Sequence, residues 1–211
     1  MEILKNQGKV NRGLIVTLSS IKSQWAKEVS KFTSHFATHA HGTEADRLKQ
    51  LKAFKNDKSL TYFVINYEML RNSKYLKLIK EIGFDAVALD EAQKIKSGVT
   101  DPILKMKPSQ NAKGAYALKY IPYRFIATAT PVQSKAEEIW SLFHFVDEDI
   151  LGDWNYFREY FCKYHPRFGI NGYKNQGELY YQIAPHFIRR TKKMPEIQQQ
   201  LPKVKHDHVF L

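Results

Sequence analysis

Two adjacent carboxylates follow an apolar run, and they are the clearest candidates for chemistry in this sequence. Residues 84–93 read FDAVALDEAQ, so Asp90 and Glu91 come directly after the run 86–89. In an open α/β sheet, ligands bind beyond the carboxyl ends of the strands. One carboxylate there can hold Mg²⁺ through its water shell, and the second can orient and deprotonate an attacking water. The alternative is an acidic helix start, because Asp and Glu favour helix N-termini.

A second apolar run ends in hydroxyl side chains. Residues 125–131 read FIATATP, so Thr128 and Thr130 stand at the end of the run and Pro131 can open a helix. Threonine hydroxyls at a strand tip can hydrogen-bond an acidic motif, a phosphate or the backbone. Taken alone, the string fits an ordinary turn before a helix equally well.

The elements that would position these residues are predicted from hydrophobic patterning. Short apolar runs rich in β-branched residues alternate with helical patterns, which predicts an α/β fold with a parallel sheet covered by helices on both faces. The expected strands are 14–18, 62–65, 86–89 and 124–127, with a weaker strand at 35–39. The expected helices are 21–31, 44–54, 73–81, 111–119 and 135–145.

The character of the chain changes at about Asp147, where aromatic residues become frequent and glycines stand at positions 169, 172 and 177. This stretch predicts a small helical, aromatic appendage with a loop rather than a continuation of the sheet. The expected division is therefore a sheet-containing unit at 1–146, the appendage at 147–190 and an exit segment at 191–211.

Composition limits the classes of function. The 211 residues are 43% hydrophobic, which suffices for a globular core, and 33 Lys and Arg against 21 Asp and Glu give a net charge of +12. That excess favours a polyanionic partner, nucleic acid before a membrane surface, although lysines that solvate helix faces give the same balance. The single cysteine excludes an internal disulfide. No run reaches the roughly 18–20 apolar residues of a membrane helix, so we expect no membrane partner.

Five motifs, in this order, resemble the Swi/Snf branch of the superfamily-two helicase-like ATPases. They are 14–28 (LIVTLSSIKSQWAKE), 64–70 (VINYEML), 90–97 (DEAQKIKS), 128–133 (TATPVQ) with 137–142 (EEIWSL), and 187–192 (FIRRTK). The resemblance extends from about Gly13 to the C-terminus. It implies a RecA-like fold of the P-loop NTPase type, ATP with Mg²⁺ as cofactors, and movement along double-stranded DNA.

The resemblance also implies roles for single residues. Asp90 would face the metal through water, Glu91 would activate the attacking water, and Gln93 would link the acids to the threonine motif. The residues expected to form the coupling motif of the family are Thr128, Thr130 and Gln133. Those expected to contact nucleic acid are Ser19, Ser20, Lys22, Arg189 and Arg190, of which the two arginines would border the region between lobes.

Two departures from the family pattern affect these expectations. The phosphate-binding pattern G-x-x-x-x-G-K-[ST] occurs nowhere, since Gly8 and Lys9 are followed by Val10. We therefore expect a first-lobe fragment of an ATP-dependent DNA translocase that neither binds ATP tightly nor hydrolyses it alone. Ala129 stands where the family has glycine, and it would strain the loop if that position needs positive φ.

Other functions and partners remain open at this point. A non-catalytic DNA-binding or assembly module would fit the same charge, and a metal-dependent phosphodiesterase could use Asp90 and Glu91 but lacks a third ligand for a two-metal site. The resemblance implies that the strand before the phosphate loop lies inside the sheet, close to the strand that bears the acids. Its absence predicts an unpaired edge, and hence self-association or a partner chain that carries the missing strand and second lobe. The expected location is the nucleus in a eukaryote, or the nucleoid-associated cytoplasm in a bacterium or phage.

Overall fold

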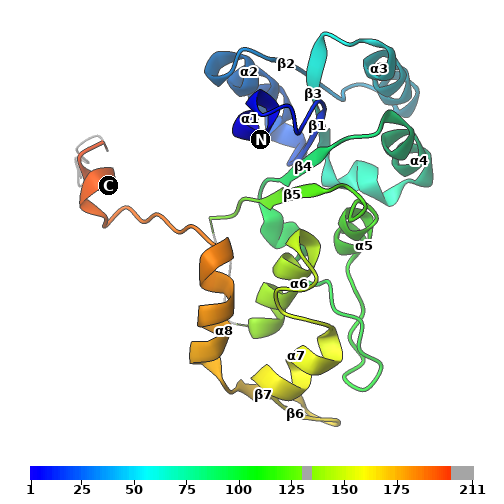
Figure 1. Ribbon diagram of the computed structural model, residues 1–211. Helices are drawn as coiled ribbons and strands as arrows, with labels where there is room; N and C mark the ends of the chain where they lie inside the picture. The colour runs from blue at the N-terminus through cyan, green and yellow to red at the C-terminus, as the bar shows by residue number, and fades with distance from the viewer. Residues whose placement is uncertain (130–134, 201–211) are drawn as a thin grey trace, which may run out of the picture.

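The computed structural model describes residues 1–129 and 135–200, and its centre is a five-stranded sheet. The strand order is β2-β3-β1-β4-β5, and every neighbouring pair is parallel (Figure 1). The strands are β1 (Gly13–Thr17), β2 (Phe36–His39), β3 (Leu60–Asn66), β4 (Ala86–Leu89) and β5 (Tyr123–Ile126). All five carboxyl ends therefore meet at one edge, and the predicted parallel α/β sheet is confirmed.

The central strands form because their residues suit burial on both faces. All five residues of β1 and the last six of β3 are buried, as a strand with sheet neighbours and helices on both sides requires. Thr17 is the one polar residue of β1, and it is completely buried at the strand's carboxyl end. A buried hydroxyl needs a hydrogen-bond partner, so the end of β1 must face a polar group.

Helices cover both faces of the sheet. On one face Ile15 and Val64 pack with Ala26 and Val29 of α2, while Leu14 lies in the larger core on the other face. Figure 1 shows α2 on the left of the sheet and α3, α4 and α5 on its right. The helices and short 3₁₀ turns of this part are α1 (Glu2–Asn6), η1 (Ser19–Ile21), α2 (Lys22–Phe32), α3 (Glu44–Asn56), η2 (Tyr67–Arg71), α4 (Ser73–Ile82), η3 (Ala92–Ile95) and α5 (Gln110–Tyr116).

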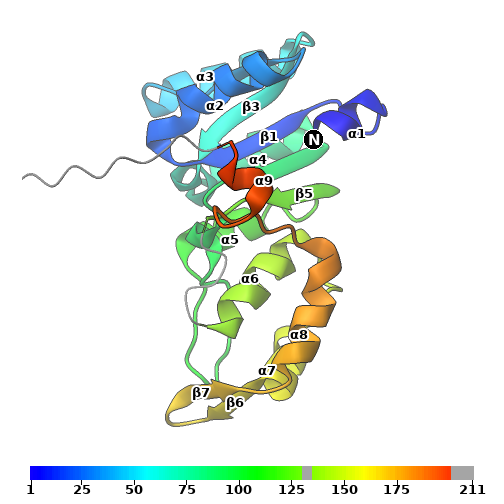
Figure 2. The ribbon, with the colours of Figure 1, turned by 90° about the vertical axis from the view of Figure 1, so that its left-hand side faces the viewer.

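The carboxyl edge of the sheet is identified by the elements that leave it. In Figure 2 the chain enters β1 beside α1 and leaves it toward α2. The turns η1, η2 and η3 follow β1, β3 and β4, which are adjacent in the sheet. Three 3₁₀ turns thus stand side by side where the predicted site residues begin.

A second core lies below the sheet. It is formed by α6 (Ala136–Val146), α7 (Trp154–Phe161), β6 (Cys162–His165), β7 (Gly169–Tyr173) and α8 (Gln176–Ile183). The turn η4 (Ala184–His186) follows α8, and the short helix α9 (Pro195–Gln198) lies outside this core. The helix α6 belongs to both cores, because Leu142 and Phe145 pack under the sheet while Trp140 and Phe143 pack against α7. The expected boundary at residue 146 therefore falls at the end of a helix that the two cores share.

The antiparallel hairpin of β6 and β7 was not predicted, since this stretch was expected to be a helical appendage with a loop. The hairpin is separate from the main sheet, as expected. Most of its residues are partly or fully exposed, so the sequence lacks the alternation of buried and polar positions that indicates a strand. Gly169, at φ 76°, permits the tight return between the strands.

Residues 98–108, named the strap here, run from η3 to α5 without regular structure and are fastened at two points. The Ser109 amide donates to the Ser97 carbonyl at 2.8 Å, which closes the strap at its base. Farther along, the buried carboxylate of Asp101 accepts from the Trp154 indole at 2.6 Å and from Arg158 Nη1 at 2.8 Å. Burial works to raise the pKa of Asp101, but these hydrogen bonds and that of the Leu104 amide hold it below its usual value.

The expected unpaired edge beside the acid-bearing strand is wrong in its location. β4 pairs with β1 on one side and with β5 on the other, so it has no free edge. Within the described part of the chain, the unpaired sides are the outer sides of the two end strands, β2 and β5. The five strands therefore form one continuous open sheet without a gap, because β1 and β4 pair directly with each other.

Replacing Asp101 with Asn should destabilise the fold by about 3 kcal/mol, because it removes the buried counter-charge of the Arg158 guanidinium and leaves only the exposed carboxylate of Glu159. The matched control is Glu81→Gln, which breaks the exposed Lys55–Glu81 pair and should cost at most about 1 kcal/mol. Urea unfolding measures both free energies. Equal losses for the two variants would show that the strap is not fastened through Asp101.

Candidate functional site

The Asp90 carboxylate follows β4 and is held in one orientation by donors from β1 and α2. Its Oδ2 atom accepts a hydrogen bond from the Thr17 hydroxyl at 2.8 Å and another from the Trp25 indole Nε1 at 2.7 Å. Its Oδ1 atom accepts from the backbone amide of Glu91 at 3.0 Å. The buried hydroxyl of Thr17 thus has its partner, and the acid is placed by neighbouring elements before any ligand is present.

Tyr67 ties the end of β3 to the same residue. Its hydroxyl donates to the backbone carbonyl of Asp90 at 2.7 Å, and its side chain is almost fully buried. Burial, together with the negative charges of Asp90 and Glu91, raises the pKa of Tyr67 far above its ordinary value, so it stays a neutral donor. The ends of three adjacent strands are thereby fixed to one another.

Glu91, Gln93 and Thr128 form a chain of hydrogen bonds that crosses from β4 to β5. Gln93 Nε2 donates to Glu91 Oε2 at 2.6 Å, and the Thr128 hydroxyl donates to Gln93 Oε1 at 2.6 Å. The backbone supports this arrangement, since the Ala92 amide donates to the Ala127 carbonyl at 2.9 Å. The structure therefore brings together four residues that the sequence analysis singled out, which are Asp90, Glu91, Gln93 and Thr128.

Backbone strain occurs at Glu91 and not at Ala129. The non-glycine residues with positive φ in the described ranges are Glu91, Lys105 and Asn175, so the condition under which Ala129 would strain the loop is not met. Glu91 has φ 52° and ψ 48°, a left-handed conformation that is unfavourable for a glutamate and is found preferentially at functional sites. The remaining two coupling candidates, Thr130 and Gln133, lie outside the described residues.

Of the three residues expected to contact nucleic acid near β1, only the serines are accessible. Ser19 and Ser20 are exposed in η1, at the carboxyl edge. Lys22 is buried, and its ammonium group donates to the Ala40 carbonyl at 2.6 Å and to Asn66 Oδ1 at 3.3 Å. The expectation that Lys22 contacts a DNA phosphate is contradicted, because its ammonium group is hydrogen-bonded inside the fold.

The pKa of Lys22 reflects this burial. Desolvation lowers it most, the positive charge of Arg47 lowers it further, and Glu68 opposes both. A lysine at the start of a helix after two serines gives no sign in the sequence that it points inward. Its direction becomes clear only from the fold, which brings the residue after β2 and the last residue of β3 close enough to provide the two acceptors.

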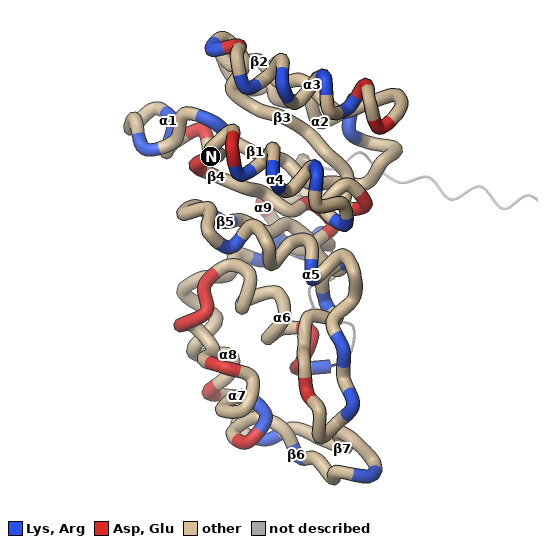
Figure 3. The backbone as a smooth tube through the Cα atoms, turned by 90° about the vertical axis from the view of Figure 1, so that its right-hand side faces the viewer, with Lys and Arg blue, Asp and Glu red and all other residues tan. Residues whose placement is uncertain are grey.

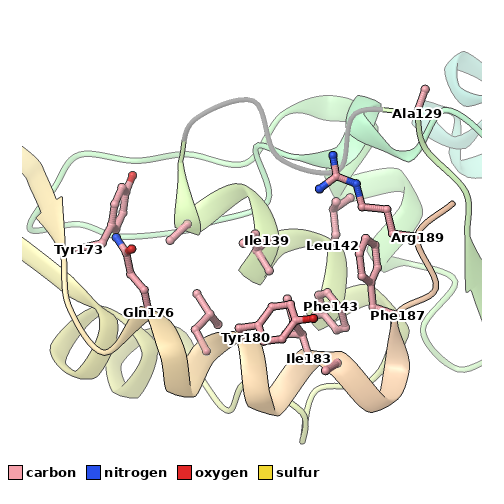
Figure 4. A pocket seen from close by; sticks show the side chains of 13 residues that line it. Ala129, Ile139, Leu142, Phe143, Tyr173, Gln176, Tyr180, Ile183, Phe187 and Arg189 are labelled. Atoms are coloured by element: carbon pink, nitrogen blue, oxygen red, sulfur yellow. The ribbon is translucent and has the colours of Figure 1, made fainter. Parts of the chain in front are cut away.

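Arg189 and Arg190 are exposed in the segment after η4 and take no part in the hydrogen bonds around Asp90. Arg189 borders an apolar groove of about 820 Å³ between α6 and α8, next to Phe187 and Leu142 (Figure 4). Ala129, at the end of the described part of the threonine motif, lines the same groove. The basic exit segment therefore passes near the end of β5.

Three residues that contact Asp90 had no assigned role in the sequence analysis. They are Thr17, Trp25 and Tyr67. A polar residue that ends an otherwise apolar strand is a usable signal for Thr17, and Tyr67 directly follows the polar residue that ends β3. Nothing local signals that the Trp25 indole reaches an acid 65 positions away in sequence.

The donor set suits a hard cation held through water. Carboxylate oxygens are the ligands that Mg²⁺ prefers, and two adjacent carboxylates are present. In residues 1–129 and 135–200 no group of three or more His, Cys, Asp or Glu side chains could hold a metal ion directly.

Comparison with known proteins decides the family. The profile of the SNF2-related domain matches residues 1–211. The chain belongs to the SNF2-related domain family. The RecA-like resemblance that the motifs indicated is thereby confirmed, and no helix in the described part of this SNF2-related chain is long and apolar enough to cross a membrane.

Similar curated proteins are much longer than this chain. The chromatin-remodeling ATPase INO80 of Saccharomyces cerevisiae is 29% identical over 194 residues, which cover 85% of this chain and 12% of INO80. INO80 of Candida glabrata is 28% identical over 194 residues with the same coverage. The SNF2-related chain thus spans about an eighth of the length of these relatives.

A solved structure confirms the fold. The Sulfolobus solfataricus SWI2/SNF2 ATPase core in complex with dsDNA superimposes with a TM-score of 0.69 at 24% identity, and covers 95% of this chain and 38% of that one. The core domain of the same organism without DNA gives a TM-score of 0.62 at 22% identity. The five-stranded sheet and its helices are therefore those of a SWI2/SNF2 core.

The hydrogen bond between Trp25 and Asp90 predicts a specific change in the indole region of an ¹H–¹⁵N correlation spectrum. The chain has three tryptophans, and the other two indoles donate to the Gly152 carbonyl and to Asp101. Asp90→Asn should shift one of the three indole signals upfield, because a charged acceptor is lost. Trp25→Phe identifies that signal. A spectrum in which Asp90→Asn leaves the Trp25 signal in place would contradict the geometry.

Proposed function

We propose that this SNF2-related chain is part of the first motor lobe of an ATP-dependent translocase that moves on double-stranded DNA. The observation that carries this proposal is the hydrogen-bonded group of Asp90, Glu91, Gln93 and Thr128 at the carboxyl edge of a SWI2/SNF2-type sheet. An acid pair at a strand's carboxyl end can hold the metal and position the attacking water. The hydrogen bonds through Gln93 to Thr128 connect this pair to the end of the next strand.

Each residue has a distinct task in this proposal. Asp90 holds Mg²⁺ through water, and its orientation is set by Thr17 and Trp25. Glu91 orients and deprotonates the attacking water. Gln93 holds the Glu91 carboxylate by one hydrogen bond and accepts another from Thr128, so the position of Glu91 is linked to the end of β5. When bound, Mg²⁺ would neutralise part of the negative charge on the phosphates of ATP. Both cofactors are proposed for the longer protein rather than for tight binding by this chain.

The proposed DNA contact lies at η1. Ser19 and Ser20 are exposed there, and hydroxyl and backbone N–H groups are common donors to DNA phosphates. The structural relative from Sulfolobus solfataricus was solved with dsDNA, and the INO80 relatives are named as chromatin-remodeling ATPases. We extend duplex binding to this chain, with nuclear residence if the source is a eukaryote.

Two further partners belong to the proposal. Arg189 and Arg190, exposed beside the groove near β5, would face a second motor lobe. The outer side of β5 would take another strand, either from a second copy or from a partner segment, because an unpaired edge exposes backbone donors and acceptors. Phe125 on β5 is 37% exposed, which leaves apolar surface for that strand to cover.

Duplex DNA should bind the chain weakly, with an affinity that falls steeply as salt increases, because the net charge is +12. Ser19→Asp with Ser20→Asp should reduce the affinity about tenfold or more, because two negative charges face the phosphates. The control is Asn6→Asp with Gln7→Glu, which adds the same charge beside α1 at the opposite edge. Fluorescence anisotropy measures both.

Lys22→Met provides an internal check in the same titration. Because Lys22 is buried, its removal should leave the dependence of affinity on salt unchanged, whereas a lysine on a phosphate would lower the slope by about 1. The proposal fails if the wild-type chain does not bind duplex DNA at low salt. The site at η1 fails if the two charge-adding double variants weaken binding equally.

A further inference from the structure

Basic residues are concentrated in one stretch of the chain, and the proposed function gives none of them a role. Residues 92–124 contain six lysines and one arginine but a single acid, Asp101. That acid lies in the buried pair with Arg158, so its charge is neutralised within the fold. The stretch therefore presents a surface of one sign, and it includes the whole strap.

Three of the seven cations are engaged within the fold. Lys96 pairs with Glu138 at 3.1 Å, Lys119 pairs with Glu148, and Arg124 donates to four backbone carbonyls. The other four are Lys94, Lys105, Lys107 and Lys113, which are exposed. None of the ion pairs in the described part of the chain includes these four. Their charges face solvent.

Lys94 and Lys113 stand at the same edge of the sheet as the proposed DNA contact. Lys105 and Lys107 lie farther along the strap, toward the appendage to which Asp101 fastens it. Lys94 lies on η3, which follows β4, and α5 packs against both η2 and η3. Arg71 of η2 fixes the start of α5 by donating to Asn111 Oδ1 at 2.9 Å and 3.1 Å. Because β1 lies between β3 and β4, η1 with its serines is flanked by η2 and η3. Figure 3 shows Lys and Arg positions continuing from α5 down the strap.

The strap holds its lysines in place. The strap turns back on itself between Asp101 and Met106, whose backbones exchange two hydrogen bonds of 3.1 Å and 2.8 Å. Its base is closed between Ser97 and Ser109, and its far part is fastened by Asp101 to the appendage. Lys105 has φ 56°, a backbone conformation that a lysine adopts only where the surrounding structure imposes it. Charges that are already ordered lose less entropy when they bind.

We propose that the strap and the start of α5 form a second phosphate-contact surface, which takes the backbone of the duplex that η1 contacts. The inference rests on the proposed function, because it needs duplex DNA at the carboxyl edge. Lys105, Lys107 and Lys113 neutralise phosphates beyond those at Ser19 and Ser20. Lysine ammonium groups act as point charges, so this surface sets affinity and orientation and reads no base sequence.

The test compares two double variants that remove the same charge. Lys105→Gln with Lys107→Gln removes two strap lysines, and Lys9→Gln with Lys58→Gln removes two exposed lysines that precede β1 and β3 at the opposite edge. Binding to a duplex is measured by anisotropy over a range of salt. The strap variant should lower the slope of log affinity against log salt by about 2, since each phosphate contact contributes about 0.9. The control should lower it by less than about 0.5.

The outcomes separate this inference from the proposed function. A wild-type chain that binds DNA while both double variants lose the same slope shows diffuse charge attraction, and overturns the strap surface alone. A wild-type chain that does not bind overturns the proposed function and the strap surface together. Thermal melting of both variants accompanies the titration, because exposed lysines should leave the melting temperature unchanged. A strap variant that melts like the wild type but binds with a reduced slope supports the inference.

Discussion

The structure depends most on how the Asp90 carboxylate is held. Thr17 at the end of β1, Trp25 on α2 and Tyr67 at the end of β3 all donate to this one residue. They can do so because β1 is paired in parallel with both β3 and β4, with Thr17 opposite Asn66 and Val16 opposite Leu89. A shift of one residue in either pairing would turn these side chains to the wrong face. The order of the sheet and the position of the acid are therefore one constraint.

This constraint also joins the acid to the proposed DNA contact. The turn η1 leads directly into α2, which carries Trp25, so the serines and the indole belong to one continuous segment. A displacement of α2 would change the donors to Asp90 Oδ2, while Glu91 is connected separately to β5 through Gln93 and Thr128. The two acids are thus linked to different parts of the lobe, although they are adjacent in sequence.

Much of this arrangement is predictable from the sequence, and there are physical reasons why the rest is not. Apolar runs that end in polar residues predict parallel strands and place Asp90 and Thr128 at one edge, because parallel strands share their carboxyl ends. The inward direction of Lys22 and the bond from Trp25 depend on contacts between distant elements, which local patterning does not contain. The β6–β7 hairpin is not predictable for a different reason, since its largely exposed strands show no alternation of buried and polar residues.

Paramagnetic broadening by Mn²⁺ tests the central claim, which is that Asp90 is a metal-binding acid held by Trp25. Small amounts of Mn²⁺, used in place of Mg²⁺, are added to the ¹⁵N-labelled chain with and without Asp90→Asn. The account predicts selective loss of the Asp90 and Glu91 amide signals and the Trp25 indole signal in the wild type. The Trp140 and Trp154 indoles, which bond elsewhere, should stay sharp, and Asp90→Asn should abolish the effect. Equal broadening of all three indoles, or broadening that persists in Asp90→Asn, would contradict it.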